Sequence, residues 1–252
     1  MEQSIEWRSS LLVNFIDYEK AFDSVDRKTL WKIMRHYGIP TKLVNLVEEL
    51  YEGSSCKILH EGQLTDSFPI KTGVKQGCIL SPFLFILAID WLMKESTAGR
   101  RNGIQWTPWT QLDDLDFADD LALLSHTQAQ MQEKTTVLDS LSRSIGLHIH
   151  AGKSKIFRIN NANQAAIVVN NKRLEEVDSF VYLGSVTDRR GGTEADIKAR
   201  IGKARTAFLS INNFGKIGQV NERMRNNCQV INKGINNYRF KDKVSSYSFI
   251  LN

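Results

Sequence analysis

The sequence predicts an α+β fold in which helices pack on one face of a small antiparallel sheet. Apolar runs of strand length alternate along the chain with amphipathic segments of helix length. Short turn signals separate several of the expected strands, which favours hairpins and therefore antiparallel pairing. The chain has 252 residues, of which 42 % are apolar and 24 % charged, so it can bury an ordinary core.

The N-terminal part of the chain is expected to hold one buried strand, two surface helices and a hairpin. The run Leu11–Ile16 is short and apolar, which predicts the buried strand. Two amphipathic patterns, the second beginning just after Pro40, predict the helices Thr29–Tyr37 and Lys42–Tyr51. A glycine turn at Glu61-Gly62-Gln63 predicts a hairpin between Ser55–His60 and Leu64–Ile70.

The middle of the chain is expected to hold two helices around a second hairpin. Ser81 as N-cap and Pro82 as first helical residue introduce the apolar helix Phe83–Lys94. A tight turn at Ala118-Asp119-Asp120 is expected to join the strands Gln111–Phe117 and Leu121–Ser125. Gly146 ends a predicted helix over Gln128–Ile145. One face of that helix carries Met131, Lys134, Leu138, Leu141 and Ile145.

Short strands and one last helix complete the expected elements. The strands are Leu147–His150, Lys155–Ile159, Ala166–Val169 and Phe180–Val186. The helix Thr193–Asn212 has an apolar stripe at spacings of three and four, formed by Ile197, Ile201, Ala204, Phe208 and Ile211. Beyond about residue 214 the periodicity fails, and residues 221–252 contain seven Asn in 32 positions. No function is assigned to that stretch, which is expected to be a divergent, disordered tail.

Charge is divided unevenly along the chain. Residues 1–126 carry 13 Lys and Arg against 18 Asp and Glu, a balance of −5. Residues 127–252 carry 20 against 10, a balance of +10. An acidic half followed by a basic half suits a metal site next to a polyanion-binding surface. Two merely solvated faces would give the same counts, so charge alone leaves both interpretations open.

Cysteine usage and the N-terminus suggest an intracellular protein, in either nucleus or cytoplasm. The three cysteines, Cys56, Cys78 and Cys228, are odd in number and lack metal-ligand spacing, so reduced thiols are expected. Met1–Ser10 has no apolar core segment of the kind found in signal peptides. The apolar stretch Pro82–Ile89 is too short to span a bilayer, so no membrane partner is expected.

Two acidic clusters, each at the end of an apolar strand, are the strongest chemical feature. The first is FIDYEKAFD, which contains Asp17, and the second is DFADDL, which contains Asp119 and Asp120. Carboxylates crowded in a partly buried site are costly, because burial and like charge both disfavour ionisation. A divalent cation removes that cost, and Mg²⁺ prefers oxygen ligands. A lone Asp-Asp pair on a turn would more often be simple turn chemistry; the second cluster favours the metal site.

Five motifs in order give the chain its resemblance to a family. FIDYEKAFDSVDR, TGVKQGCILSPFLF, FADD, GLHIHAGKSK and FVYLGSVTDRRGGTEADIKARIGKARTAF lie within about residues 7–212. The ordered set resembles the reverse transcriptase domain of non-LTR (LINE-type) retrotransposons. His150 and Ser154 stand where that family usually has Asn and Thr. The resemblance implies a right-hand polymerase palm with a partial helical thumb, an RNA template, a DNA primer and deoxynucleoside triphosphates (dNTPs).

The resemblance also assigns metal and catalytic roles. Asp17 and Asp119 match the carboxylates that hold two Mg²⁺ ions, with Mn²⁺ as a possible substitute, and Asp120 matches the third acid. The carboxylates of Asp17 and Asp119 are therefore expected to face each other across neighbouring strands. Lys153 matches the lysine that approaches the pyrophosphate leaving group.

Nucleotide and nucleic-acid contacts are implied in the same way. Ile16 and Tyr18 match positions that contribute backbone near the triphosphate, and Phe22 matches the residue that excludes a 2′-hydroxyl. Gln76 and Gly77 match the loop beside the template base and incoming nucleotide. The basic residues of the last helix, which resembles the thumb surface that follows the duplex backbone, are Lys198, Arg200, Lys203 and Arg205.

The expected organisation is a palm over residues 1–190, the start of a thumb over 191–215 and the tail over 216–252. Only 16 residues precede Asp17, so most of the fingers region of such polymerases is expected to be missing. The leading interpretation is an RNA-directed DNA polymerase domain with little or no polymerase activity on its own. A catalytically inactive remnant that only binds nucleic acid is the alternative. A nucleotide cyclase is disfavoured by the Gln76-Gly77 segment and the basic last helix.

Overall fold

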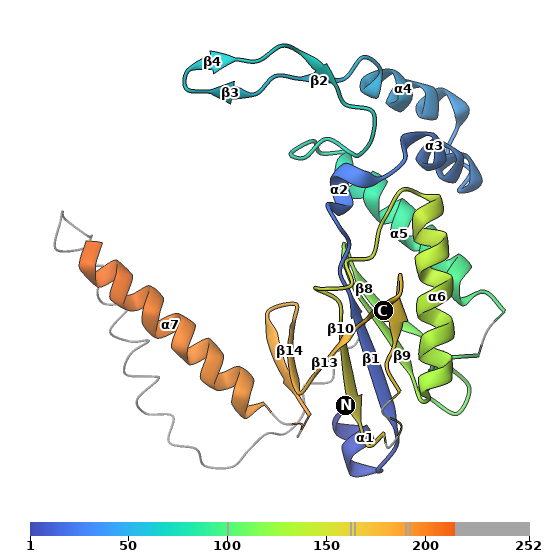
Figure 1. Cartoon of the computed structure of the whole chain (residues 1–252), viewed down its shortest axis with the longest axis vertical. Helices are drawn as coiled ribbons and strands as arrows, with labels where there is room; N and C mark the ends of the chain where they lie inside the picture. Colours follow the sequence, from blue (N-terminus) through green and yellow to red (C-terminus); the bar gives the residue numbers. More distant parts are fainter. Residues whose placement is uncertain (100, 162, 164, 190, 192, 215–252) are drawn as a thin grey trace. The chain divides into compact units, whose positions relative to one another are not determined.

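A computed structural model describes residues 1–99, 101–161, 163, 165–189, 191 and 193–214. The chain forms two compact units, Met1–Gly192 and Thr193–Asn252. The first unit contains a five-stranded sheet with the order β13-β10-β1-β9-β8 (Figure 1). Its strands are β1 (Leu11–Ile16), β8 (Asp114–Phe117), β9 (Asp120–Ser125), β10 (Lys155–Ile159) and β13 (Glu175–Val177). All neighbours are antiparallel except β10 and β13, which run parallel.

Strand β1 is the centre of the fold, because all six of its residues are buried. Alternate side chains point to opposite faces of the sheet. Leu12 and Ile16 join the larger core, which also contains side chains of α3 (Arg27–His36), α5 (Ser81–Thr97) and α6 (Gln128–Ser144). Asn14, on the same face, donates from Nδ2 to Thr135 Oγ1 of α6 at 2.9 Å. Helices therefore cover one face, as the sequence predicted (Figure 1).

The opposite face of the sheet carries a second, smaller core. Leu11, Val13 and Phe15 of β1 lie there with residues of β9 and β10. A hairpin of β14 (Ser179–Tyr182) and β15 (Ser185–Asp188) covers part of this face. Phe180 of that hairpin stacks on Phe15 with ring centroids 4.0 Å apart. Both faces of β1 are thus enclosed, which explains why its sequence is apolar throughout rather than alternating.

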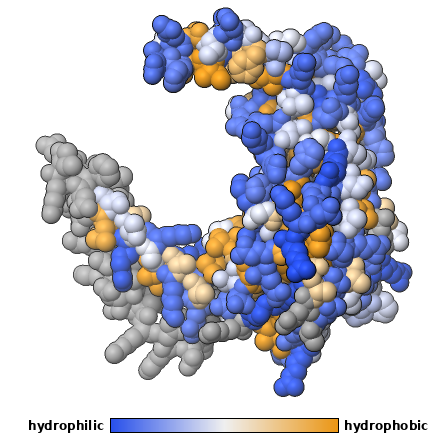
Figure 2. All heavy atoms as spheres, viewed as in Figure 1, coloured by the Kyte–Doolittle hydropathy of each residue, from blue (hydrophilic) through white to orange (hydrophobic). Residues whose placement is uncertain are grey.

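The remaining elements are short. They are α1 (Glu2–Glu6), α2 (Ala21–Ser24), α4 (Thr41–Tyr51), β2 (Ser55–Cys56), β3 (Leu59–His60), β4 (Gln63–Leu64), β5 (Phe68–Pro69), β6 (Ile104–Gln105), β7 (Gln111–Leu112), β11 (Val168–Val169) and β12 (Lys172–Arg173). The predicted glycine hairpin is present, since β2 pairs with β5 and β3 with β4. Figure 2 shows apolar atoms along this hairpin, where Leu59 and Leu64 are 67 % and 64 % exposed.

Several element boundaries differ from the sequence-based expectation. Leu80, not Ser81, is the N-cap of α5, and the Ser81 hydroxyl donates instead to the carbonyl of Lys75 at 2.6 Å. The expected strand Gln111–Phe117 is divided at Asp113 into β7 and β8, because β7 pairs with β6 in a separate hairpin.

Later in the chain, two expected strands have a different form. Phe180–Val186 is a hairpin rather than one strand, since Leu183 and Gly184 adopt positive φ angles of 49° and 79° at its turn. Leu147–His150 forms only a single bridge, between Ile149 and Tyr18. Strand β13 was not expected from the sequence.

The second unit contains α7 (Glu194–Phe214), the helix expected over Thr193–Asn212. Its apolar stripe stays at least partly exposed within this unit at the positions whose side chains are described, such as Ile201 and Phe208. Throughout the described part of the chain, every helix is too short or too polar to cross a membrane. The expected tail over 216–252, including Cys228, lies outside the described residues.

Candidate active site

The two acidic clusters meet at one end of the central sheet. Asp17 directly follows β1, and Ile16 is paired with Leu121 of β9. Because the pairing is antiparallel, the next position along β1 lies across from Asp120. Asp119 occupies the two-residue turn that joins β8 and β9, next to Ala118, whose φ is 56°. The register thus places the backbone of Asp120 across from Asp17, rather than that of Asp119 as expected, and Asp119 lies in the adjacent turn.

The electrostatics of this sheet end reflect the crowding of negative charge. Loss of solvent around the carboxyl of Asp120 raises its pKa, and the charges of Asp119 and Asp17 raise it further. Asp17 Oδ1 is enclosed and lacks a hydrogen-bond partner. Lys153 is the nearby cation, with its Nζ atom 3.9 Å from Asp17 Oδ1. Both side chains are about half-exposed, so Lys153 Nζ can also reach a bound ligand.

The three carboxylates offer the oxygen ligands that Mg²⁺ prefers. A divalent cation would satisfy the enclosed Asp17 Oδ1 and offset the repulsion around Asp120. As they lie, no three His, Cys, Asp or Glu side chains of the described residues are grouped closely enough to hold a metal ion. The donor chemistry therefore fits a divalent cation, whereas a complete three-carboxylate ligand set is not formed.

The segment that carries Lys153 also fixes the backbone of Asp17. The Asp17 amide donates to Ser154 Oγ at 3.1 Å, and the His150 amide donates to the Asp17 carbonyl at 2.8 Å. Ser154 is fully buried. Sequence reasoning missed this role for Ser154, although its place directly after Lys153 in the fourth motif was a signal. Lys153 and the position of Asp17 thus depend on one short stretch of chain.

Tyr182 is a second residue that sequence reasoning missed. Its hydroxyl lies 3.2 Å from the carbonyls of Leu115 and Asp120 and donates toward both, so it contacts both strands of the acidic hairpin. Burial, followed by the nearby aspartate charges, raises the pKa of Tyr182 to about 12. Its side chain lines a small cavity of about 50 Å³ together with Asp17, Asp120 and Lys153. The aromatic residue within the fifth motif was the available signal.

Of the expected nucleotide-binding residues, Ile16 and Tyr18 direct their side chains into the core. Ile16 is 3 % exposed and Tyr18 is 6 % exposed. The Tyr18 hydroxyl shares a 2.8 Å hydrogen bond with Ser142 Oγ, and burial raises its pKa well above the usual range. Ile16 is nevertheless among the residues that line the 50 Å³ cavity beside Asp17, whereas Tyr18 is not. Contact with a nucleotide through the backbone of these residues stays a prediction.

The expected nucleotide-selecting residues lie close together at α2. They are Phe22, Gln76 and Gly77. Phe22 is half-buried and stacks on Phe85 of α5 with ring centroids 4.3 Å apart. Gln76 Nε2 donates to Asp23 Oδ1 at 3.1 Å, which ties the loop to the residue after Phe22. Gly77 adopts a φ of 81°, which favours glycine at this turn. The structure thus brings the expected sugar and base residues to one place.

The four basic residues of α7 are exposed and belong to the second unit. Lys198 lies 3.7 Å from Glu194, and Arg200 lies 2.7 Å from Asp196, each one helical turn away. Lys203 and Arg205 follow on the same helix.

The comparisons with known proteins agree with the fold and the motifs. The family model for reverse transcriptase (RNA-dependent DNA polymerase) matches residues 3–187. The chain belongs to this family. It is therefore a reverse transcriptase domain of the kind found in non-LTR retrotransposons, and reverse transcriptases generally use divalent metal ions.

Two curated relatives are retrotransposon proteins. The Pol polyprotein from type-2 retrotransposable element R2DM of Drosophila melanogaster is 36 % identical over 152 residues, covering 58 % of this chain and 14 % of that protein. The RNA-directed DNA polymerase from mobile element jockey of Drosophila funebris is 24 % identical over 184 residues, covering 69 % of this chain and 19 % of that protein. The chain thus spans less than a quarter of either relative.

Solved telomerase structures share the fold. Telomerase of Candida tropicalis with a fragment of telomeric RNA aligns with a TM-score of 0.53 at 12 % identity, covering 80 % of this chain and 34 % of that one. The apo enzyme truncated from its C-terminal domain gives 0.51 at 14 % identity, covering 74 % and 36 %. At such low identity the likeness concerns the fold alone, and it confirms the predicted α+β polymerase palm.

Proposed function

We propose that this chain is the catalytic palm core of an RNA-directed DNA polymerase that extends a DNA primer on an RNA template. The observation that carries the proposal is the meeting of Asp17 with Asp120, and with the Asp119 turn, at one end of the sheet. The reaction class is attack of a primer 3′-hydroxyl on the α-phosphate of a dNTP, with pyrophosphate leaving. Family membership supports this reaction over the cyclase alternative.

Asp17, Asp119 and Asp120 would hold two divalent cations, Mg²⁺ or Mn²⁺. When bound, such ions supply neutralising charge at the attacking and leaving oxygens of the phosphoryl transfer. The enclosed Asp17 Oδ1, which accepts no hydrogen bond, supports this assignment. Ser154, which accepts from the Asp17 amide, and Tyr182, which donates to the Asp120 carbonyl, would keep the acidic strand ends in place.

Lys153 would stabilise the leaving pyrophosphate. Its side chain is 65 % exposed, and its Nζ atom lies only 3.9 Å from Asp17 Oδ1, so the ammonium group can turn toward a phosphate without leaving the site. A positioned ammonium group can neutralise the departing oxygen or donate a proton to it.

Phe22 and the Gln76-Gly77 loop would select the incoming nucleotide. Phe22 has its ring held by Phe85, which gives it a fixed surface against which a 2′-hydroxyl would clash. Gln76 offers both a donor and an acceptor next to it. The exposed basic side chains of α7, including Lys203 and Arg205, would contact phosphates of the template–primer duplex.

Primer extension tests the proposal. Residues 3–187 would replace the matching segment of the R2DM polyprotein, and the hybrid would be supplied with an RNA template, a DNA primer, dNTPs and Mg²⁺. We expect extension by the hybrid, because the inserted segment brings Asp17, Asp119 and Asp120 to the same end of the sheet. A hybrid that binds template–primer but extends no primer, while unmodified R2DM does, would favour the inactive remnant.

Changing Phe22 should alter sugar selection. In the hybrid, Phe22→Ala removes the ring that faces the sugar, so ribonucleotide incorporation should rise at least about tenfold relative to deoxynucleotide incorporation. The measurement is the ratio of kcat/KM values for a matched ribo- and deoxynucleotide. Leu80→Ala, a partly buried change at the start of α5, is the control for loosened packing. Equal discrimination in parent and Phe22→Ala would remove Phe22 from this role.

A further inference from the structure

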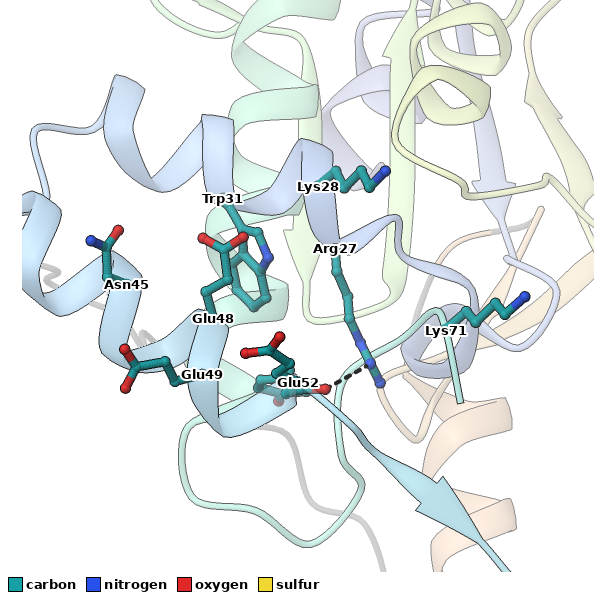
Figure 3. A pocket seen from close by; sticks show the side chains of 9 residues that line it. Arg27, Lys28, Trp31, Asn45, Glu48, Glu49, Glu52 and Lys71 are labelled. Carbon is teal, nitrogen blue, oxygen red and sulfur yellow. Dashed lines mark hydrogen bonds between the residues drawn. The ribbon is translucent and has the colours of Figure 1, made fainter. Parts of the chain in front are cut away.

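Arg27, the first residue of α3, makes an unusual number of contacts outside the acidic site. Its guanidinium donates to the carbonyls of Gly73 at 2.8 Å, Ile70 at 2.8 Å and Thr72 at 3.1 Å. A longer contact of 3.4 Å reaches the carbonyl of Tyr51, and the same group lies 4.8 Å from the centre of the Tyr51 ring. Figure 3 shows the Arg27 side chain extending from α3 toward the end of α4, near Glu52. One side chain thus joins the end of α4 to the stretch 70–73.

The stretch that Arg27 holds leads directly to Gln76. Its backbone is also bonded to α2, since the Val74 amide donates to the Phe22 carbonyl at 2.7 Å and the Gly73 amide to the Val25 carbonyl at 2.8 Å. Glycine is required at position 73, where φ is 75° and an added Cβ would lie 2.6 Å from backbone atoms of Asp23. Residues 70–76 therefore follow the backbone of α2 closely.

The chemistry of this clamp suits arginine rather than lysine. Neighbouring carbonyls at different angles need several donors on one rigid plane, which a guanidinium provides and an ammonium does not. Burial lowers the pKa of Arg27, because its positive charge has lost part of its solvent. The carbonyls and the Tyr51 ring compensate for that loss.

We propose that Arg27 is a positioning residue that holds the loop 70–76 against α2, so that Gln76 and Phe22 keep a fixed relation at the nucleotide site. The functional part of this inference rests on the proposed polymerase function. The clamp itself concerns only this chain and can be tested without any reaction.

The test is amide hydrogen exchange in the full chain, comparing the parent with Arg27→Lys. We expect exchange at Gly73 and Val74 to accelerate at least about tenfold, since bonds to a charged donor are lost beside them. Lys28→Ala, which removes the neighbouring exposed cation of α3, should change these amides less than about twofold. Unchanged exchange at both amides in Arg27→Lys, or equal acceleration in Lys28→Ala, would overturn the clamp.

A second arm measures extension kinetics in the hybrid. Arg27→Lys should raise the KM for dNTP at least about fivefold and leave kcat within about twofold, because a displaced loop weakens nucleotide binding more than chemistry. A fall in kcat with unchanged KM would overturn the positioning role. Faster exchange in the Arg27→Lys chain, together with no synthesis by the unmodified hybrid, would support the clamp while contradicting the proposed function, so the two failures are distinguishable.

Discussion

Asp119→Asn is expected to reduce primer extension by the R2DM hybrid at least about 10³-fold. Asn keeps the size of the side chain and its place in the β8–β9 turn, but it removes the negative charge needed for a divalent cation. Asp17→Asn should have an effect of similar size. Template–primer binding should change little, because neither substitution alters the duplex-binding surface of the hybrid.

Asp116→Asn is the matched control. Asp116 is an exposed carboxylate of the same hairpin, paired with Leu121 in β8–β9, and its loss should alter extension by less than about threefold. The comparison is made by single-turnover incorporation of one nucleotide at saturating Mg²⁺. Equal rates for Asp119→Asn and Asp116→Asn would show that the acidic turn has no catalytic part.

Lys134→Ala is expected to lower the free energy of unfolding by about 3–5 kcal/mol, because breaking a buried ion pair leaves uncompensated polar groups. Lys134 lies in α6 and is 3 % exposed. Its Nζ atom is 2.8 Å from Asp113 Oδ1 and donates to the carbonyls of Asp113 and Leu124 at 2.7 and 2.9 Å. It therefore joins the covering helix to β9 and to the chain leading into β8.

Urea unfolding of the full chain measures this effect, with the midpoint shifting and the slope staying constant. Lys32→Ala, which removes an exposed lysine of α3, is the control and should cost less than about 0.5 kcal/mol. Lys134→Met fills the same space without charge and should be nearly as destabilising, because the Asp113 carboxylate loses its cation and both carbonyls lose the Lys134 donor. A loss below about 1 kcal/mol in Lys134→Ala would show that the ion pair is dispensable.

Periodicity and turn signals were enough to predict the elements that build the site. Leu11–Ile16, the hairpin at Asp119 and the helix with Lys134 on its apolar face are all present. Their signals are local, since each depends on side chains within one strand or helix turn. The helix pattern also placed Lys134 on the apolar face, where its ammonium group would need a buried partner. The pattern could not identify that partner.

What could not be predicted depends on pairing between distant residues. Strand β13 is three residues long, and it joins the edge of the sheet by parallel pairing with β10. Ser154 contacts Asp17 across 137 positions of sequence, and Tyr182 contacts Asp120 across 62. The register that places Asp120 rather than Asp119 across from Asp17 is likewise a property of the assembled sheet.

We propose that Asp17, Asp119 and Asp120 together bind the divalent cations of a polymerase. Electron paramagnetic resonance of Mn²⁺ titrated into this chain, with template–primer present, measures that binding. We expect bound Mn²⁺ that Mg²⁺ displaces, with affinity reduced at least about tenfold in Asp17→Asn and in Asp119→Asn but unchanged in Asp116→Asn. Mn²⁺ bound equally by all four proteins, or by none of them, would contradict it.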